Sequence, residues 1–205
     1  MDDSELIEEH KAGLKEANEF FSNPNKRQRE LFTVREFLLN LGVSFKENDL
    51  EFVSDDPPDI IFHDARFEIK ELLDKGRKRH EEYKNALKKA ESADKFSDLL
   101  ELYTLAEVSL DKVIGLINEQ LNEINYSPDV CRHLDILFYV NLHRKGILIE
   151  NKRVSFKDES WHKWRSLSIV GNSSLSCVLW ASPQAPDFLK LIEGNIIVRK
   201  ALNSY

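Results

Sequence analysis

The sequence predicts a mixed α/β domain in which a mixed sheet is flanked by helices and interrupted by a long helical insertion. Three observations indicate this fold class. Helical periodicity occurs at the start and middle of the chain, short alternating segments typical of strands lie near residues 59–71, and strand-like segments return after residue 134. The 205 residues are 41% hydrophobic and 32% charged, which is typical of a folded globular domain.

In the first half of the chain we expect two helices followed by short strands. The first helix is expected over residues 3–21, where apolar side chains recur near helical spacing before the Ser-Asn-Pro-Asn cluster. The second is expected over 26–41, because the apolar residues from Leu31 to Leu41 repeat at helical spacing and Gly42 suits the residue after the C-cap. Strands are expected over 43–46, 50–53, 59–63 and 66–71, with the last two forming a hairpin.

In the second half we expect a long helical region over 77–124, with a break near 92–94. Its later part carries an apolar stripe that must lie against the core or against another subunit, formed by Ala106, Leu110, Val113, Ile117, Leu121 and Ile124. Strands over 134–142, 147–156, 168–170 and 177–181 and a short helix over 186–192 complete the chain. The expected parts are therefore an N-terminal helix (1–25), a first part of the core (26–76), a helical insertion (77–126) and a C-terminal part completing the sheet (127–205).

Composition limits the classes of function and the compartment. No apolar run reaches the roughly 20 residues needed to span a bilayer, and the N-terminus is acidic where a signal peptide is basic, so we expect a cytoplasmic protein without a membrane partner. Cys131 and Cys177 lack zinc-binding spacing and are interpreted as buried thiols. The net charge of -7 indicates that any contact with nucleic acid must come from a local basic patch.

The residues that indicate a chemical function are Asp59, Glu68 and Lys70. Asp59 opens one expected strand, and Glu68 and Lys70 lie two residues apart on the next, so their side chains point to the same face. Two carboxylates from adjacent strands suit a hard divalent cation, which polarises a phosphodiester and helps to generate hydroxide. A lysine beside them can orient the attacking water and offset developing negative charge. The pattern therefore predicts metal-dependent hydrolysis of a phosphodiester.

This arrangement resembles the PD-(D/E)XK nuclease superfamily, over about residues 26–90 and with the strand from Leu134 as a further core strand. The chain is also similar as a whole to a bacterial family described only as candidate endonucleases. The resemblance implies that Asp59 and Glu68 ligate Mg²⁺ or Mn²⁺, that the Ile69 carbonyl is a third ligand, and that Lys70 assists the nucleophile. A glutamate from the preceding helix is also implied, and Glu30 is preferred to Glu36 because Glu30 lies on the inward side.

A basic stretch over residues 75–89 follows the motif directly and is the candidate surface for nucleic acid. Its side chains could neutralise phosphates beside the scissile bond, and His80, Tyr83 and Lys84 share one helical face. The predicted nucleic-acid-binding residues are Arg77, Lys78, Arg79, His80, Tyr83 and Lys84. A solvated helix surface is the alternative interpretation.

We predict a nuclease with DNA as the favoured substrate, although the sequence does not separate DNA from RNA. A homodimer is a hypothesis, because the acidic surface leaves one subunit little room to hold a duplex. The alternative is a catalytically inactive nuclease-fold module that binds nucleic acid or a protein partner. A helical interaction protein in which the motif is a coincidence is a further alternative. A second match, Asp129 followed by Glu150 and Lys152, is rejected because a full strand separates its two halves.

Overall fold

The computed structural model describes residues 2–54, 57–154, 157–171 and 174–199. The chain forms two compact units: one contains the residues up to Arg29 together with Lys75–Thr104, and the other contains Glu30–Asp74 and the residues from Leu105 onward. The expected divisions after residues 25 and 76 stay predictions; the two units meet along the chain at residues 29/30 and 74/75. The expected helical insertion over 77–126 is instead divided between the two units at residue 104.

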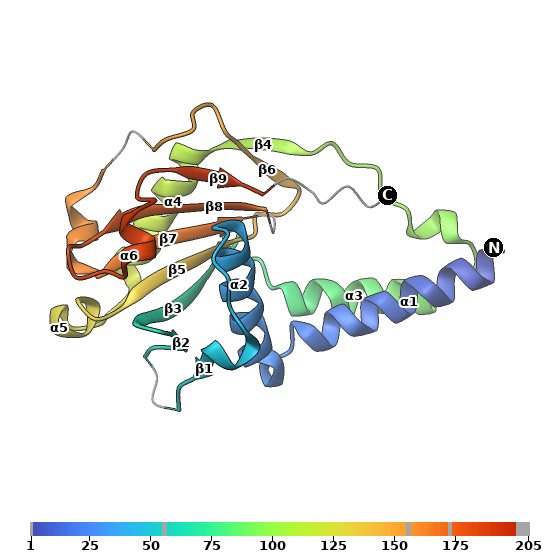
Figure 1. Ribbon diagram of the computed structural model, residues 1–205. Coiled ribbons are helices and arrows are strands. Elements are labelled where there is room, and N and C mark those ends of the chain that lie inside the picture. The colour runs from blue at the N-terminus through green and yellow to red at the C-terminus, as the bar shows by residue number, and fades with distance from the viewer. Residues whose placement is uncertain (1, 55–56, 155–156, 172–173, 200–205) are drawn as a thin grey trace. The chain divides into compact units, whose positions relative to one another are not determined.

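The second unit is built on a mixed sheet of seven strands in the order β1-β2-β3-β5-β7-β8-β9 (Figure 1). β3, β5 and β7 are parallel to one another, and antiparallel pairs extend the sheet on both sides. This confirms the expected mixed sheet. The strands are β1 (Leu50–Phe52), β2 (Ile60–Phe62), β3 (Ala65–Leu72), β5 (Asp135–Val140), β7 (Ser166–Gly171), β8 (Leu175–Ala181) and β9 (Ile196–Val198).

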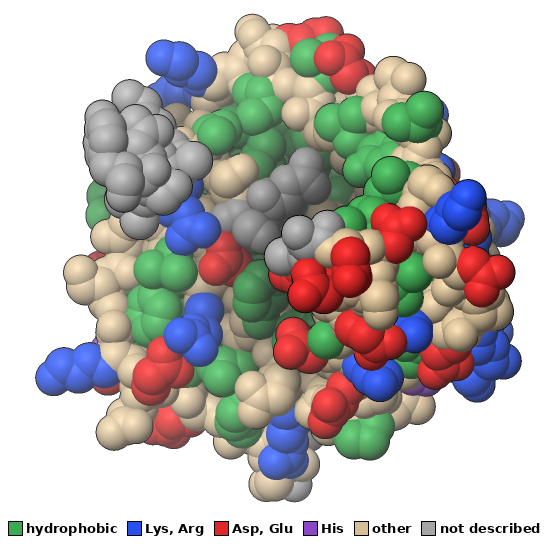
Figure 2. All heavy atoms as spheres, turned by 90° about the vertical axis from the view of Figure 1, so that its right-hand side faces the viewer, with side chains coloured by type: hydrophobic (Ala, Val, Ile, Leu, Met, Phe, Trp, Pro, Cys, Tyr) green, Lys and Arg blue, Asp and Glu red, His purple; other side chains and the backbone are tan. Residues whose placement is uncertain are grey.

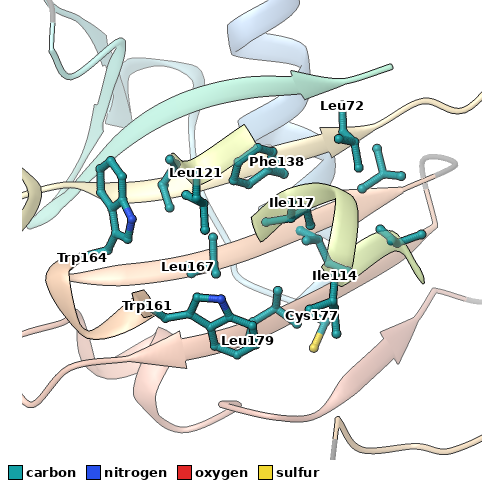
Figure 3. Close-up of a cluster of buried hydrophobic side chains, with 14 of the residues drawn as sticks. Leu72, Ile114, Ile117, Leu121, Phe138, Trp161, Trp164, Leu167, Cys177 and Leu179 are labelled. Atoms are coloured by element: carbon teal, nitrogen blue, oxygen red, sulfur yellow. The ribbon is translucent and has the colours of Figure 1, made fainter. Parts of the chain in front are cut away.

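Helices pack on both faces of this sheet. Val34 and Phe37 of α2 (Lys26–Asn40) pack in one buried cluster with Phe67 of β3, and Leu189 of α6 (Asp187–Lys190) joins the same cluster. α4 (Leu110–Glu123) covers the opposite face, where its apolar side chains contact those of β5, β7 and β8 (Figure 3). Side chains alternate along β3, so Phe67 faces α2 whereas Glu68 and Lys70 face the α4 side.

The apolar stripe of α4 therefore lies in the core of its own chain. Val113, Ile117 and Leu121 are each at most 1% exposed. The core alternative is confirmed. Because the buried side chains of the stripe pack against the sheet of their own chain, they are not available as an interface for the hypothetical homodimer. Cys131 and Cys177 are buried free thiols, as expected.

Several elements differ from the sequence-based expectations. Ala106 begins a strand, not a helix: β4 (Ala106–Ser109) pairs in parallel with β6 (Lys145–Leu148) in a separate two-stranded sheet, and the helix starts only after the N-cap Ser109. Residues 43–46 form no strand, whereas β9 and the short helix α5 (Pro128–Cys131) were not expected. The strand expected over 147–156 is confined to its start, and residues 155–156 lie outside the described part of the chain.

The first unit consists mainly of α1 (Asp3–Phe20) and α3 (Arg79–Glu91), with the short turns η1 (Asn23–Asn25) and η3 (Phe96–Leu99). α1 begins at a capping box in which Asp2 accepts from the backbone of Glu5 and the Glu5 side chain accepts from Asp2. The expected helix over 3–21 is thus confirmed. None of the described helices has the length and apolar character needed to cross a membrane.

Candidate functional site

Asp59 and Glu68 stand opposite each other at the start of the β2–β3 hairpin. Ile60 pairs with Phe67 in antiparallel register, so the preceding residue Asp59 falls opposite Glu68. Asp59 is 8% exposed, and its Oδ2 accepts a hydrogen bond of 2.8 Å from the backbone N–H of Ile69. Asp59 is therefore fixed to β3, the strand that carries Glu68 and Lys70.

The Glu68 carboxylate is buried and only partly satisfied. Its Oε1 accepts hydrogen bonds from Lys70 Nζ at 2.6 Å and from the Tyr126 hydroxyl at 2.7 Å, and the residue is 1% exposed. Its Oε2 is buried and has no hydrogen-bond partner within the described part of the chain. Burial raises the pKa of Glu68, the negative charge of Asp59 raises it further, and the bonds from Lys70 and Tyr126 oppose both effects.

Lys70 connects this buried pair to solvent. Its side chain is 27% exposed, whereas the Glu68 side chain to which it is bonded is 1% exposed. The Lys70 ammonium also lies 5.6 Å from the centroid of the Tyr126 ring. Both contacts hold the ammonium on the α4 side of β3.

The donor set fits a divalent cation. An ionised carboxylate oxygen that is buried without a partner is costly, and a cation bound at Glu68 Oε2 would offset that cost and the repulsion from Asp59. The Ile69 N–H points toward Asp59, and the N–H and C=O of one strand residue point to the same side, so the Ile69 carbonyl also points toward this place. The Ile69 side chain packs on the opposite face of the sheet, as expected.

Glu30 is not brought into this group. It is buried at 7% exposure on α2, whose apolar side chains pack on the Phe67 face, whereas Glu68 lies on the other face of β3. Within the described ranges, no three His, Cys, Asp or Glu side chains lie close enough together to hold a metal ion. The structure thus brings together Asp59, Glu68 and Lys70 and leaves the role of Glu30 a prediction.

Most of the predicted nucleic-acid-binding residues are engaged within the first unit. Arg79 is buried with its guanidinium 3.5 Å from the Phe21 ring centroid, and Tyr83 stacks on the same ring at 5.1 Å. The Nδ1 atom of His80 lies 3.1 Å from the Asn18 carbonyl oxygen. Two residues of the predicted substrate face, His80 and Tyr83, therefore contact the C-terminal part of the first helix and Phe21.

The remaining basic residues differ in exposure. Arg77 is bonded to Glu82 at 2.8 Å, whereas Lys78 and Lys84 are exposed and stay candidates for phosphate contact. On the face shown in Figure 2, Lys and Arg side chains are interspersed with Asp and Glu side chains.

Tyr126 is the site residue that sequence reasoning missed. It follows α4 in a loop, and its hydroxyl reaches Glu68 across 58 positions of the chain. No local pattern marks it, because the contact depends on where the crossover from β3 to β5 returns to the sheet. The residues of the rejected second match lie in different elements. Asp129 lies on α5 with its side chain 89% exposed, whereas Glu150 and Lys152 lie in a loop.

The comparisons with known proteins agree with an α/β fold. A solved structure of a protein of unknown function from Pseudomonas aeruginosa strain PAO1, described as belonging to the monooxygenase superfamily, is similar to the chain with a TM-score of 0.65 and 25% sequence identity. The match covers 98% of each chain. No curated protein matches this chain. The family model described as "Putative endonuclease, protein of unknown function (DUF1780)" matches residues 2–204, and the chain belongs to this family.

Proposed function

We propose that the protein is a Mg²⁺- or Mn²⁺-dependent nuclease that hydrolyses phosphodiester bonds, with DNA as the favoured substrate. The observation that carries the proposal is the buried Asp59–Glu68 pair, with the unpaired Oε2 of Glu68 and the ammonium of Lys70 beside it. The endonuclease description of the family supports the same class of reaction. β5 adds in parallel beside β3 after a helical crossover, which supports the resemblance to the PD-(D/E)XK core.

Each residue of the site has a distinct role in this proposal. Asp59, Glu68 and the Ile69 carbonyl would hold the cation, which when bound supplies Lewis-acid polarisation of the phosphate. Lys70 would donate hydrogen bonds to the attacking water and to a phosphate oxygen that gains negative charge as the phosphorus–oxygen bond breaks. Tyr126 would keep the Glu68 carboxylate oriented while its other oxygen faces the cation.

A hydrolytic role is preferred because the groups that gather at this site are two carboxylates and an ammonium. These groups bind a hard cation and stabilise charge on a phosphate. The monooxygenase description belongs to the Pseudomonas aeruginosa protein, and at 25% identity the likeness supports a shared fold more than a shared reaction.

The direct test is cleavage of labelled single-stranded, duplex and branched DNA and of RNA, in Mn²⁺, Mg²⁺ or EDTA. We expect metal-dependent cutting by the wild type and a loss of about 100-fold or more in Asp59→Asn and Lys70→Ala. Asp129→Asn and Lys152→Gln, from the rejected match, are the matched controls and should cut normally. Equal activity in all variants would exclude this site.

Metal binding can be tested without any substrate. Excess Mn²⁺ should stabilise the wild type by mass action and so raise its melting temperature. The gain in free energy of unfolding is about 2.7 kcal/mol when the ion is at 100 times its dissociation constant. Asp59→Asn should abolish this rise in melting temperature. Glu30→Gln should keep it, because Glu30 is not among the proposed ligands. No Mn²⁺ shift and no cutting of any substrate would favour the non-catalytic binding module.

A further inference from the structure

A pocket of about 500 Å³ lies in the second unit at the end of the sheet where β5 and β7 begin and β8 ends. This volume is within the range of small-molecule sites. Its lining contains two arginines and two histidines, Arg132, His133, His162 and Arg165, and no Asp or Glu side chain. The sequence motif assigns no function to this region.

Two residues that line the pocket carry a buried polar atom that has no partner within the described residues. The indole Nε1 of Trp164 and the hydroxyl of Ser182 are both buried without a hydrogen bond, and Trp164 as a whole is 1% exposed. An indole N–H can only donate, so a ligand that satisfies it must bring an acceptor. Buried polar groups are almost always paired, which makes two unpaired ones beside the same pocket an indication of a ligand.

The charges of the lining favour an anion as that acceptor. Arg165 is ion-paired with the buried Asp135, which fixes its position and offsets part of its charge. Arg132 forms only a 3.4 Å contact with Asp129, and its side chain is 68% exposed, so it is free to turn toward a ligand. An arginine fork and an indole N–H together match the several oxygens of a phosphate.

We propose that this pocket binds a phosphate monoester, the group shared by a mononucleotide and by the phosphorylated end of a nucleic-acid strand. A bare ion would leave much of the volume empty, whereas a sugar and base would occupy it. His162, which lines the pocket, offers a ring for a base to stack on, and its other ring contact is with Trp180 at 4.3 Å between centroids. The proposal concerns binding and stands whether or not the chain cuts nucleic acid.

The pocket is in contact with the candidate active site through two rings. Trp164, which stands at one end of the buried cluster in Figure 3, meets the Tyr126 ring edge-on with centroids 6.3 Å apart. The hydroxyl of Tyr126 in turn bonds Glu68. A phosphate held at Trp164 would therefore lie beside the residues that support the acidic pair.

The test is binding in EDTA, which separates this pocket from the metal site. We expect inorganic phosphate and AMP to raise the melting temperature and to show saturable binding by calorimetry, whereas adenosine and acetate do not. A 5′-phosphorylated oligonucleotide and its 5′-hydroxyl counterpart then distinguish a strand end from a free nucleotide as the source of the phosphate.

Variants locate the binding. Arg132→Gln and Trp164→Phe should each weaken AMP binding by about tenfold, because each removes a donor to the phosphate. Arg153→Gln, which removes the same charge from an exposed arginine lining a different pocket, and Asp59→Asn should bind AMP as the wild type does. Absence of phosphate and AMP binding, or unchanged binding by both Arg132→Gln and Trp164→Phe, would overturn the proposal.

Discussion

At the scale of single residues, the site places the Glu68 carboxylate where burial and the neighbouring Asp59 disfavour its ionised form. Glu68 is buried opposite Asp59, and two donors, from Lys70 and Tyr126, hold one of its oxygens. Burial is the largest influence on its pKa and raises it. Such an arrangement costs stability in the free protein and is typical of residues retained for binding or catalysis.

Replacing Glu68 by glutamine should stabilise the metal-free protein. Because the folded state holds the proton more tightly than the unfolded chain, stability falls as pH rises above the ordinary value of 4.5 and toward the raised folded-state pKa. Glutamine mimics the protonated form and avoids this loss. In EDTA at pH 8, Glu68→Gln should melt higher than wild type, by about 2–4 °C per kcal/mol recovered. The difference should vanish below pH 4.5; a variant that melts lower at pH 8 would show that burial of the charge is not the cause.

Replacing Tyr126 by phenylalanine should move the pH dependence of the site. The lost hydrogen bond favours the ionised carboxylate, so the pKa of Glu68 should rise further and the free energy of unfolding should fall by roughly 1.5–3 kcal/mol. The Mn²⁺-induced rise in melting temperature should then begin at higher pH than in the wild type. Tyr103→Phe, at a tyrosine that is 59% exposed, is the control and should leave the profile unchanged. An identical profile for both variants would remove Tyr126 as a positioning residue.

At the scale of elements, β3 explains how four successive residues serve two purposes. Phe67 and Ile69 pack on the α2 face, whereas Glu68 and Lys70 point to the α4 side. The two-residue period of the strand therefore places the chemistry on one face and the core on the other. The same strand accepts β2 on one edge and β5 on the other, which buries Glu68 in the middle of the sheet.

Two glycines test how backbone conformation affects the stability of the helices that cover this sheet. Gly42 follows α2 with φ of 70°, a conformation that alanine adopts only with strain, whereas Gly115 lies exposed within α4. Neither position crowds an added Cβ. Gly42→Ala should lower the free energy of unfolding by about 1 kcal/mol, and Gly115→Ala should raise it by about 0.5–1 kcal/mol. Urea unfolding measures both, and the same sign for the two substitutions would show that backbone conformation is not the cause.

At the scale of the whole molecule, the two units differ in how much apolar surface they bury. Both large clusters of buried side chains lie in the second unit. In the first unit, Ile7, Arg79 and Ala90 are the only buried residues among those that the structure describes. The contacts in the first unit include the capping box of α1 and the ring contacts of Phe21 with Arg79 and Tyr83.

Hydrogen exchange should therefore distinguish the units. Regions with few buried contacts open at low free energy, so the amides of α1 and α3 should exchange well before those of β5 and β7. Native-state exchange followed by mass spectrometry measures this order along one chain. Equal protection in both units would mean that they unfold together, as one domain.

The sequence by itself determined the elements whose pattern is local. The helices α1 and α2, the hairpin of β2 and β3, and the shared face of Glu68 and Lys70 follow from periodicity, from the turn residues and from the alternation of a strand. The burial of the α4 stripe was one of two alternatives, and apolar spacing alone does not say whether such a stripe meets its own sheet or another chain.

Only the tertiary structure decided which distant residues meet. Tyr126 reaches Glu68, Glu30 lies on the other face of the sheet, and the unpaired groups of Trp164 and Ser182 line one pocket. The strand β4 pairs with β6 although the sequence around Ala106 repeats at helical spacing. In each case the deciding interaction joins segments far apart in the chain, and long-range pairing and burial override the local preference from which sequence reasoning starts.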